Sequence, residues 1–238
     1  ASNFGKTIQV STFGASHGYA IGGIVEGLPC GHTIDIDELQ TFLKRRAPGQ
    51  NQLQTQRKEA DIPEFLSGMV DGMLSGSPLA FMIRNTSQHS GDYNNLRDIP
   101  RPSHADFTAR MRYGDKVDMR GGGHFSARLT APLCVAGGIA LQLLREKGIE
   151  IHGHLKQVGT IQDTPIDMVH PDMKALAKIA TETIAMIDAD KRFEVENLIM
   201  KLKKDGDSTG GIVEVVATGL PIGLGNPNFD GIENRLAR

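Results

Sequence analysis

The stretch HADFTARMRYGDKVDMRGGGHFSARLTAP, residues 104–132, places an imidazole, a triple glycine and two arginines in front of an apolar segment. Gly121, Gly122 and Gly123 give the backbone conformational freedom, and a helix is predicted over 126–148, directly behind them. The first amide N–H groups of a helix point back toward the loop that precedes it, so this connection predicts an anion-binding site. The helix is rich in Ala and Gly, and we expect it to be buried against close neighbours.

Strand and helix signals alternate on both sides of this stretch. Two strands are expected at 8–13 and 20–27, around a Gly-Ala-Ser-His-Gly turn that carries His17. The polar segment 47–63 has no apolar period, so we expect an exposed flexible loop there. The remaining patterns predict strands at 65–70, 79–84, 149–161 and 210–221, helices at 35–46, 171–187 and 190–204, and the start of a helix at 230.

Composition indicates one large domain or two closely packed halves. The 238 residues are 39% hydrophobic and 23% charged with a net charge of −2, so a nucleic-acid binder, which is normally basic, is disfavoured. No signal peptide and no apolar run of about 18 residues is recognised. Cys30 and Cys134 lie far apart, outside any CxxC spacing, which predicts free thiols in a cytoplasmic protein.

One sequence pattern occurs twice. GGIVEGLPCG (22–31) and GGIVEVVATGLPIG (210–223) share a strand that ends in Gly-Leu-Pro-x-Gly, which suggests an internal duplication. The helix that begins at Asp230 has no glycine or proline stop before the last residue. We therefore expect the chain to be incomplete at its C-terminus.

Arginines and histidines near turns are the candidates for chemistry. A guanidinium binds phosphate and carboxylate bidentately; a single one is more often a solvated surface residue, but several together imply a polyanionic ligand. His17 and His104 lie in loops and suit proton transfer near neutral pH. The arginines in or beside turns are Arg45, Arg46, Arg57, Arg101, Arg120 and Arg128.

The glycine loop and the histidine pair also fit other interpretations. The RGGG loop also fits a plain flexible loop or an RNA-binding fragment, but no aromatic stacking platform accompanies it. A Walker-type phosphate loop is excluded because GxxxxGK[ST] does not occur. His152 and His154 form an HxH pair without a third ligand at a recognisable spacing, so we favour a surface edge strand and predict no metal site.

TFGASHG, KRRAPG, RPSHADFT and above all RGGGHFSARLTAP, taken together in this order, resemble the chorismate synthase family over the whole length of the chain. The resemblance implies an α+β fold, a β-α-β sandwich with helices packed between two antiparallel sheets and an internal pseudo-duplication. It implies one domain over 1–238, incomplete at its C-terminus, in a cytoplasmic homotetramer that binds neither nucleic acid nor membrane.

The resemblance also implies a reaction. Chorismate synthases are lyases that convert 5-enolpyruvylshikimate 3-phosphate into chorismate and phosphate by a 1,4-anti elimination, the last step of the shikimate pathway toward the aromatic amino acids. They are flavoproteins that need reduced FMN (FMNH2) without net redox change, and NADPH is a candidate reductant of that flavin.

Specific residues match the family motifs. By resemblance His17 protonates the leaving phosphate, His104 protonates the reduced flavin, and Ser16 relays a proton. The flavin-contacting triplet falls on His124, Phe125 and Ser126. The substrate anions are expected to bind Arg46, Arg57, Arg101 and Arg128.

A few positions depart from the family pattern. Ala15 stands where an acidic residue is usual, Ser103 replaces the usual glycine, and Gln52 stands where many members have arginine. Three hypotheses follow: an enzyme active in its complete form, a non-catalytic flavin- or anion-binding remnant, and a nucleic-acid binder using the RGGG loop and 44–58. The charge balance counts against the third hypothesis.

Overall fold

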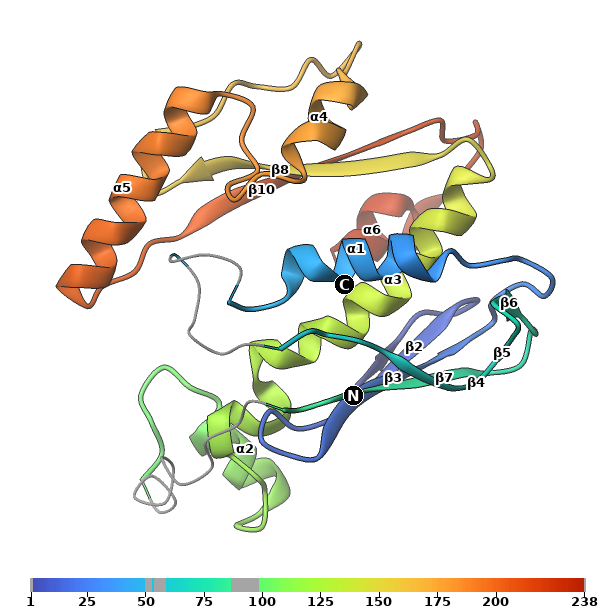
Figure 1. Cartoon of the computed structure of the whole chain (residues 1–238), viewed down its shortest axis with the longest axis horizontal. Helices are drawn as coiled ribbons and strands as arrows, with labels where there is room; N and C mark the ends of the chain where they lie inside the picture. Colours follow the sequence, from blue (N-terminus) through green and yellow to red (C-terminus); the bar gives the residue numbers. More distant parts are fainter. Residues whose placement is uncertain (1, 50–52, 54–58, 87–98, 238) are drawn as a thin grey trace. The chain divides into compact units, whose positions relative to one another are not determined.

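The computed structural model describes residues 2–49, 53, 59–86 and 99–237. The chain divides into two compact units, Ala1–Gln142 (unit 1) and Leu143–Arg238 (unit 2). Each unit combines an antiparallel sheet with helices, which confirms the α+β class (Figure 1). The expectation of a single domain, with helices enclosed between the two sheets, concerns how the units join and stays a prediction.

Unit 1 is built on a five-stranded sheet. Its strands, in the order β1-β2-β3-β7-β4, are Asn3–Phe4, Gln9–Gly14, Ala20–Glu26, Leu79–Arg84 and Glu64–Ser67, and all neighbours are antiparallel. The strands predicted at 8–13, 20–27 and 79–84 are therefore confirmed. Buried side chains come from alternate positions of the central strands, as expected for a sheet with one covered face: Ile21, Val25, Leu79, Phe81 and Ile83.

The strand predicted at 65–70 is interrupted. Gly68 has φ of +82°, and a Cβ there would lie 2.4 Å from Cα of Leu79. The chain therefore leaves β4 at this residue and forms a separate small hairpin, β5 (Met69–Val70) with β6 (Met73–Leu74).

Two helices cover one face of this sheet, α1 (Ile36–Arg46) and α3 (Thr130–Arg145) (Figure 1). The carboxylate of Asp35 caps α1 by accepting from the amide of Glu38 at 2.8 Å. A Cβ at Gly138 of α3 would lie 2.5 Å from Cδ1 of Leu39, so glycine allows α3 to approach α1 closely. The burial predicted from the small residues of α3 is confirmed. The short helix α2 (Asp106–Tyr113) was not predicted.

The segment Arg120–Arg145 is long and apolar enough, by length and composition alone, to be a candidate membrane span. Its continuous α-helix is only the 16 residues of α3, because Gly121–Gly123 leave helical geometry and a 3-10 turn, η3 (Ala127–Leu129), follows. A span needs about 20 helical residues. Ala131, Val135 and Ile139 of α3 are fully buried in the protein, which is the behaviour of a core helix.

Unit 2 contains a three-stranded sheet, in the order β10-β8-β9, with β8 (Glu150–Val158) in the centre between β10 (Gly211–Thr218) and β9 (Ile161–Gln162). Its helices are α4 (Met173–Ile179), α5 (Ala189–Asp205) and the short α6 (Ile232–Leu236). The helix predicted over 171–187 is wrong beyond Ile179. The hydroxyl of Thr181 bonds back to the carbonyl of Lys178 at 2.8 Å, a local bond that competes with helix continuation.

The repeated sequence pattern has a structural counterpart. Gly27 follows β3 with φ of +83°, and its Cβ would lie 2.1 Å from the carbonyl oxygen of Thr7, just before β2. Gly219 follows β10 with φ of +72°, and its Cβ would lie 2.0 Å from the carbonyl oxygen of Gly148, just before β8. In both units, therefore, a strand paired antiparallel with an earlier strand ends with the same glycine-dependent contact, which supports the duplication.

Candidate functional site

The turn between β2 and β3 presents Ser16 and His17 inside unit 1. The two residues are 2% and 9% exposed, and Nδ1 of His17 lies 3.2 Å from Oγ of Ser16. Asn85, directly after β7, holds this turn in place: its side-chain amide donates to the carbonyls of Ala15 at 3.0 Å and Gly18 at 2.8 Å. Because β7 pairs with β3, the sheet register sets where His17 stands.

The triple glycine packs directly on this turn. Gly121, Gly122 and Gly123 have φ of +59°, +92° and +55°, the region that favours glycine. A Cβ at Gly121 would lie 2.1 Å from Cε1 of His17, and the carbonyl of Gly123 accepts from the amide of Ser16 at 3.0 Å. The predicted association of the glycine loop with the catalytic candidates is therefore present in the structure.

Two of the predicted substrate arginines share one carboxylate. Nη1 of Arg46, on α1, bonds to Oδ2 of Asp61, and Nη1 of Arg128, on η3, bonds to Oδ1 of the same residue. Nε of Arg128 also donates to Oδ1 of Asn85 at 3.2 Å. One chain of hydrogen bonds thus runs from the His17 turn through Asn85 and Arg128 to Asp61 and Arg46.

Arg128 keeps one donor for a ligand. Its side chain is only 3% exposed, and Nη2 has no hydrogen-bond partner among the residues that the structure describes. Oε2 of Glu59 lies 3.9 Å from that nitrogen. Glu59 itself accepts from the amide and hydroxyl of Thr86 at 3.1 and 2.9 Å. A buried guanidinium nitrogen without a partner is suited to an anionic ligand.

The expectation of an exposed loop at 47–63 is wrong at its C-terminal end. Glu59 and Asp61 are 4% and 2% exposed, and they supply the carboxylates that face Arg128. Sequence reasoning missed them because a polar segment without an apolar period normally indicates solvent. The available signal was charge: a buried arginine requires a carboxylate partner, and this segment carries acidic residues.

Arg101 and His104 lie on a separate segment of unit 1. Arg101 forms a bidentate pair with Asp106 at 2.7 and 2.9 Å and donates to the carbonyl of Met119 at 3.2 Å. The Arg101 hydrogen bond holds the pKa of Asp106 below its ordinary value. His104 is exposed, and Ser103, at the position where the resemblance expects glycine, has φ of +61°. The structure therefore does not join His104 to His17 through the chain of hydrogen bonds described above.

The three residues predicted to contact flavin follow the glycine loop. Nδ1 of His124 donates to the carbonyl of Gly14 at 2.9 Å, and Nε2 lies 2.7 Å from the Ser2 hydroxyl oxygen. Ser126 caps η3 by accepting from the amide of Arg128 at 3.2 Å. The ring of Phe125 is 45% exposed and is the member of the triplet that offers a flat surface to a ligand.

The remaining arginine candidates behave differently. Arg45 is exposed. Arg120 pairs with Asp118 at 2.9 and 2.8 Å; this hydrogen bonding holds the pKa of Asp118 below its ordinary value, and the charge of His17 acts in the same direction. Arg57 lies outside the described residues.

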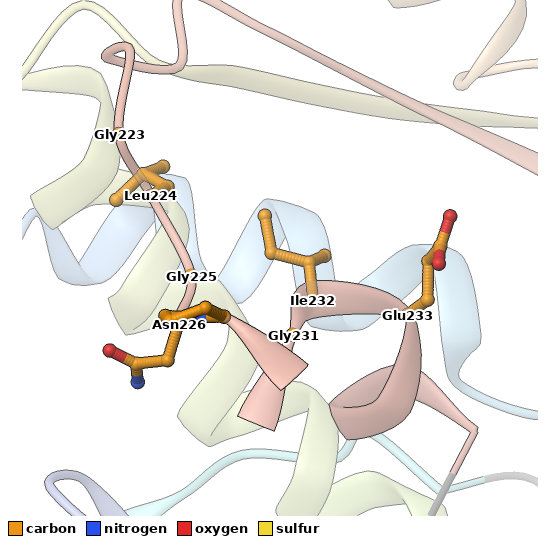
Figure 2. Close-up of a pocket in the computed structure, with 8 residues that line it drawn as sticks. Gly223, Leu224, Gly225, Asn226, Gly231, Ile232 and Glu233 are labelled. Atoms are coloured by element: carbon orange, nitrogen blue, oxygen red, sulfur yellow. The ribbon is translucent and has the colours of Figure 1, made fainter. Parts of the chain in front are cut away.

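A hollow of about 500 Å³ lies in unit 2, between the loop 223–226 and helix α6 (Figure 2). Its wall is mostly glycine backbone and apolar side chains, with Leu224 and Ile232 on facing sides. Glu233 is its one charged residue, and none of the predicted site residues lines it. Convergent polar groups are what a catalytic pocket needs, so the site is placed in unit 1.

The pair His152 and His154 in unit 2 does not lie on an edge strand. β8 is the central strand, and His154 is 1% exposed, with Nδ1 2.9 Å from Asp163 and Nε2 3.1 Å from Glu214. The surface interpretation of this motif is wrong because a histidine between two carboxylates satisfies both ring nitrogens in the interior. Within the described ranges, no group of three or more His, Cys, Asp or Glu side chains is arranged to hold a metal ion.

Comparison with known proteins agrees with this geometry. The family model described as "Chorismate synthase" matches residues 8–238. The chain belongs to the chorismate synthase family. The chorismate synthase of Lancefieldella parvula is 43% identical over 247 residues, which cover 99% of this chain and 65% of that protein. The chorismate synthase of Bacteroides thetaiotaomicron is 45% identical over 228 residues, or 96% of this chain and 62% of the relative.

A solved structure gives the same result for the fold. The protein titled "Crystal Structure of Chorismate Synthase" superposes with a TM-score of 0.68 at 26% identity, covering 93% of this chain and 61% of that one. This chain therefore spans 62% to 65% of the length of the chorismate synthases with which its sequence was compared above.

Proposed function

We propose that this chain takes part in the chorismate synthase reaction, the elimination of phosphate from 5-enolpyruvylshikimate 3-phosphate. The observation that carries the proposal is the buried chain of hydrogen bonds that joins the Ser16–His17 turn to Arg128 and Arg46 through Asn85 and Asp61. It supports the proposal because it connects a histidine and two guanidinium groups in one site. A substrate with a phosphate and two carboxylates needs this combination.

The chemistry of the residues fits an elimination. One C–O bond and one C–H bond break and one C=C bond forms, so a phosphate and a proton leave with no net redox change. Arg128, whose Nη2 has no hydrogen-bond partner in the described part of the chain, and Arg46 bind and orient the anionic groups. His17 lies in a buried turn, where an imidazolium can give its proton to the departing phosphate oxygen. Ser16, with Oγ 3.2 Å from Nδ1 of His17, is placed to relay a new proton to that ring afterwards.

The residues after the glycine loop fit a flavin. Phe125 exposes an aromatic ring beside the ring of His124, and their centroids are 6.2 Å apart. We assign His124, Phe125 and Ser126 to the flavin, and the exposed His104 to proton delivery to it. A reduced flavin supplies the electron-rich partner that the family reaction requires, and reduced FMN is the proposed form, with NADPH as its candidate reductant.

The same proposal covers the other ligands and the setting. Arg101 and Arg57 are assigned to substrate anions; Arg101 must then exchange part of its contact with Asp106 when the ligand arrives. The proposed partner is the small-molecule substrate, and the proposed assembly is a homotetramer in the cytoplasm.

The direct test is phosphate release under anaerobic conditions, with 5-enolpyruvylshikimate 3-phosphate and reduced FMN. We expect release with reduced FMN and none with oxidised FMN. Binding of the substrate without release would instead support the non-catalytic anion-binding remnant. Salt-sensitive RNA binding at sub-micromolar affinity would support the nucleic-acid hypothesis.

A further inference from the structure

Asp61 lies between the two arginines of the site, and no motif in the sequence assigned it a role. We propose that Asp61 is a positioning residue, whose carboxylate fixes the spacing and orientation of the Arg46 and Arg128 guanidinium groups for the anionic substrate. The inference rests on the proposed function for the identity of that anion. The bridging geometry itself does not depend on it.

Both carboxylate oxygens of Asp61 are in use. Oδ2 accepts from Arg46 and Oδ1 accepts from Arg128, and the Asp61 side chain is fully buried. The three residues come from different parts of unit 1: α1, the segment before β4, and η3. A rigid planar carboxylate between two rigid planar guanidinium groups therefore sets their relative placement more directly than any single element does.

The backbone at Asp61 also indicates a specific role. Its φ is +50°, a left-handed conformation that a residue with a side chain adopts at a cost. This conformation persists where the surroundings enforce it, and here the side chain is held by two guanidinium groups. A glycine or asparagine would enter this region more easily but would not carry the charge.

Asp61 accepts a hydrogen bond from Nη1 of each arginine, which leaves the other guanidinium nitrogens for other partners. Nε of Arg46 donates to Oγ1 of Thr130 at 3.2 Å, and Nε of Arg128 donates to Asn85. Nη2 of Arg128 has no hydrogen-bond partner among the described residues. Each arginine is thus anchored by Nη1 and Nε, which fixes the direction of Nη2 of Arg128.

Two roles of Asp61, an effect of its charge and an effect on arginine orientation, predict opposite changes in anion affinity when the carboxylate is removed. A carboxylate close to two guanidinium groups lowers the attraction of the site for an anion, so its removal should tighten anion binding if charge alone matters. If Asp61 orients the arginines, its removal should weaken binding although the site becomes more positive. The sign of the change therefore separates the two roles.

The test compares Asp61→Asn with two controls of equal charge change. Glu59→Gln removes a charge near Arg128 without breaking the bridge, and Glu64→Gln removes a surface carboxylate that pairs with Arg84. For Asp61→Asn we expect the dissociation constants of inorganic phosphate and of 5-enolpyruvylshikimate 3-phosphate to rise by about tenfold. KM should rise similarly, with kcat changed by less than about threefold. We expect Glu59→Gln to bind these anions slightly more tightly and Glu64→Gln to bind them as the wild type does.

Unchanged or tighter anion binding by a folded Asp61→Asn variant would overturn the proposal. If that variant does not fold, Asp61→Glu decides by the same criterion, because it keeps the charge and moves the carboxylate by one methylene.

Exchange of the Arg46 and Arg128 Nη–H protons, which donate to Asp61, can be followed by NMR in wild type and variant and does not depend on the substrate. Faster exchange in Asp61→Asn supports the bridge even where no phosphate is released from 5-enolpyruvylshikimate 3-phosphate, a result that would reject only the proposed function. Unchanged exchange at both arginines would overturn the inference.

Discussion

The backbone of Gly121 lies so close to the ring of His17 that a Cβ would stand 2.1 Å from Cε1 and 2.2 Å from Nδ1 of the imidazole. Any side chain at Gly121 must therefore displace His17 or the loop. The glycine loop therefore packs directly against the proposed proton donor, in addition to preceding a helix.

Gly121→Ala should impair the site through this contact. We expect kcat to fall by about tenfold or more, because a shift of about 1 Å in a catalytic group can cost as much as 10²-fold. Gly122→Ala is the matched control, since Gly122 also has a positive φ (+92°) but its Cβ would meet only Ser126, at 3.4 Å. Steady-state kinetics of both variants tests the idea, and equal losses in the two would show that backbone strain, and not the His17 contact, is responsible.

Asn85 is expected to be needed as an amide. Asn85→Asp keeps an acceptor for Nε of Arg128 but replaces two donated hydrogen bonds with repulsion of the carbonyls of Ala15 and Gly18. We expect a loss of about 1–3 kcal/mol in the free energy of unfolding and a lower kcat. Urea unfolding and turnover should be compared with Asn3→Asp, the same chemical change at an exposed position of β1. An Asn85→Asp variant as stable and active as Asn3→Asp would refute the role of Asn85.

His104 is expected to affect turnover and not substrate affinity. It is exposed, and the chain of hydrogen bonds around Arg46 and Arg128 does not include it. His104→Ala should lower kcat by about 10²-fold, as for a lost general acid, with little change in the dissociation constant of the substrate. A variant that turns over like the wild type would remove His104 from the mechanism.

The sequence indicated the candidate residues of unit 1 better than the contacts that hold them in place. The motifs identified Ser16, His17 and Arg128, because glycine loops and basic turns have local signatures. Asn85 and Asp61 have no such signature. Each forms its hydrogen bonds with residues far away in the chain, and these residues come close only through the sheet register and the packing of α1 against α3. The site roles of all these residues are still predictions, and Arg57 lies outside the described residues.

Unit 2 shows the same limit. The alternating pattern predicted the strand β8. Its central position in the sheet depends on pairing with β10, about 60 residues later, and an alternating pattern alone does not predict such long-range pairing. The burial of His154 follows from that pairing and from Asp163 and Glu214. The shared glycine contact of Gly27 and Gly219 was foreseen only as a repeated motif.

Asp163 should make the stability of the protein depend on acid pH. Burial acts to raise the pKa of this carboxyl, but the amides of Asp188 and Ile187 and the ring of His154 outweigh it and hold the pKa below its ordinary value. The folded state therefore favours the carboxylate. Its stabilisation is complete above the unfolded pKa of about 3.9 and is lost as the pH falls through the lower folded value.

Asp163→Asn measures this contribution. An amide cannot accept from both backbone donors with two oxygens, so we expect a loss of about 1–3 kcal/mol at pH 7. The difference in unfolding free energy between wild type and variant should shrink as the pH falls below about 4. A difference that stays constant across this range would show that the ionised carboxylate is not the stabilising form.

The most direct measurement of the central claim is a single-turnover experiment with 5-enolpyruvylshikimate 3-phosphate and reduced FMN, in wild type and in His17→Ala. The account predicts that the wild type forms chorismate and phosphate in equal amounts and that His17→Ala binds the substrate but releases phosphate at least about 10²-fold more slowly. Equal rates in the two proteins would contradict the assignment of the buried Ser16–His17 turn as the site of phosphate elimination.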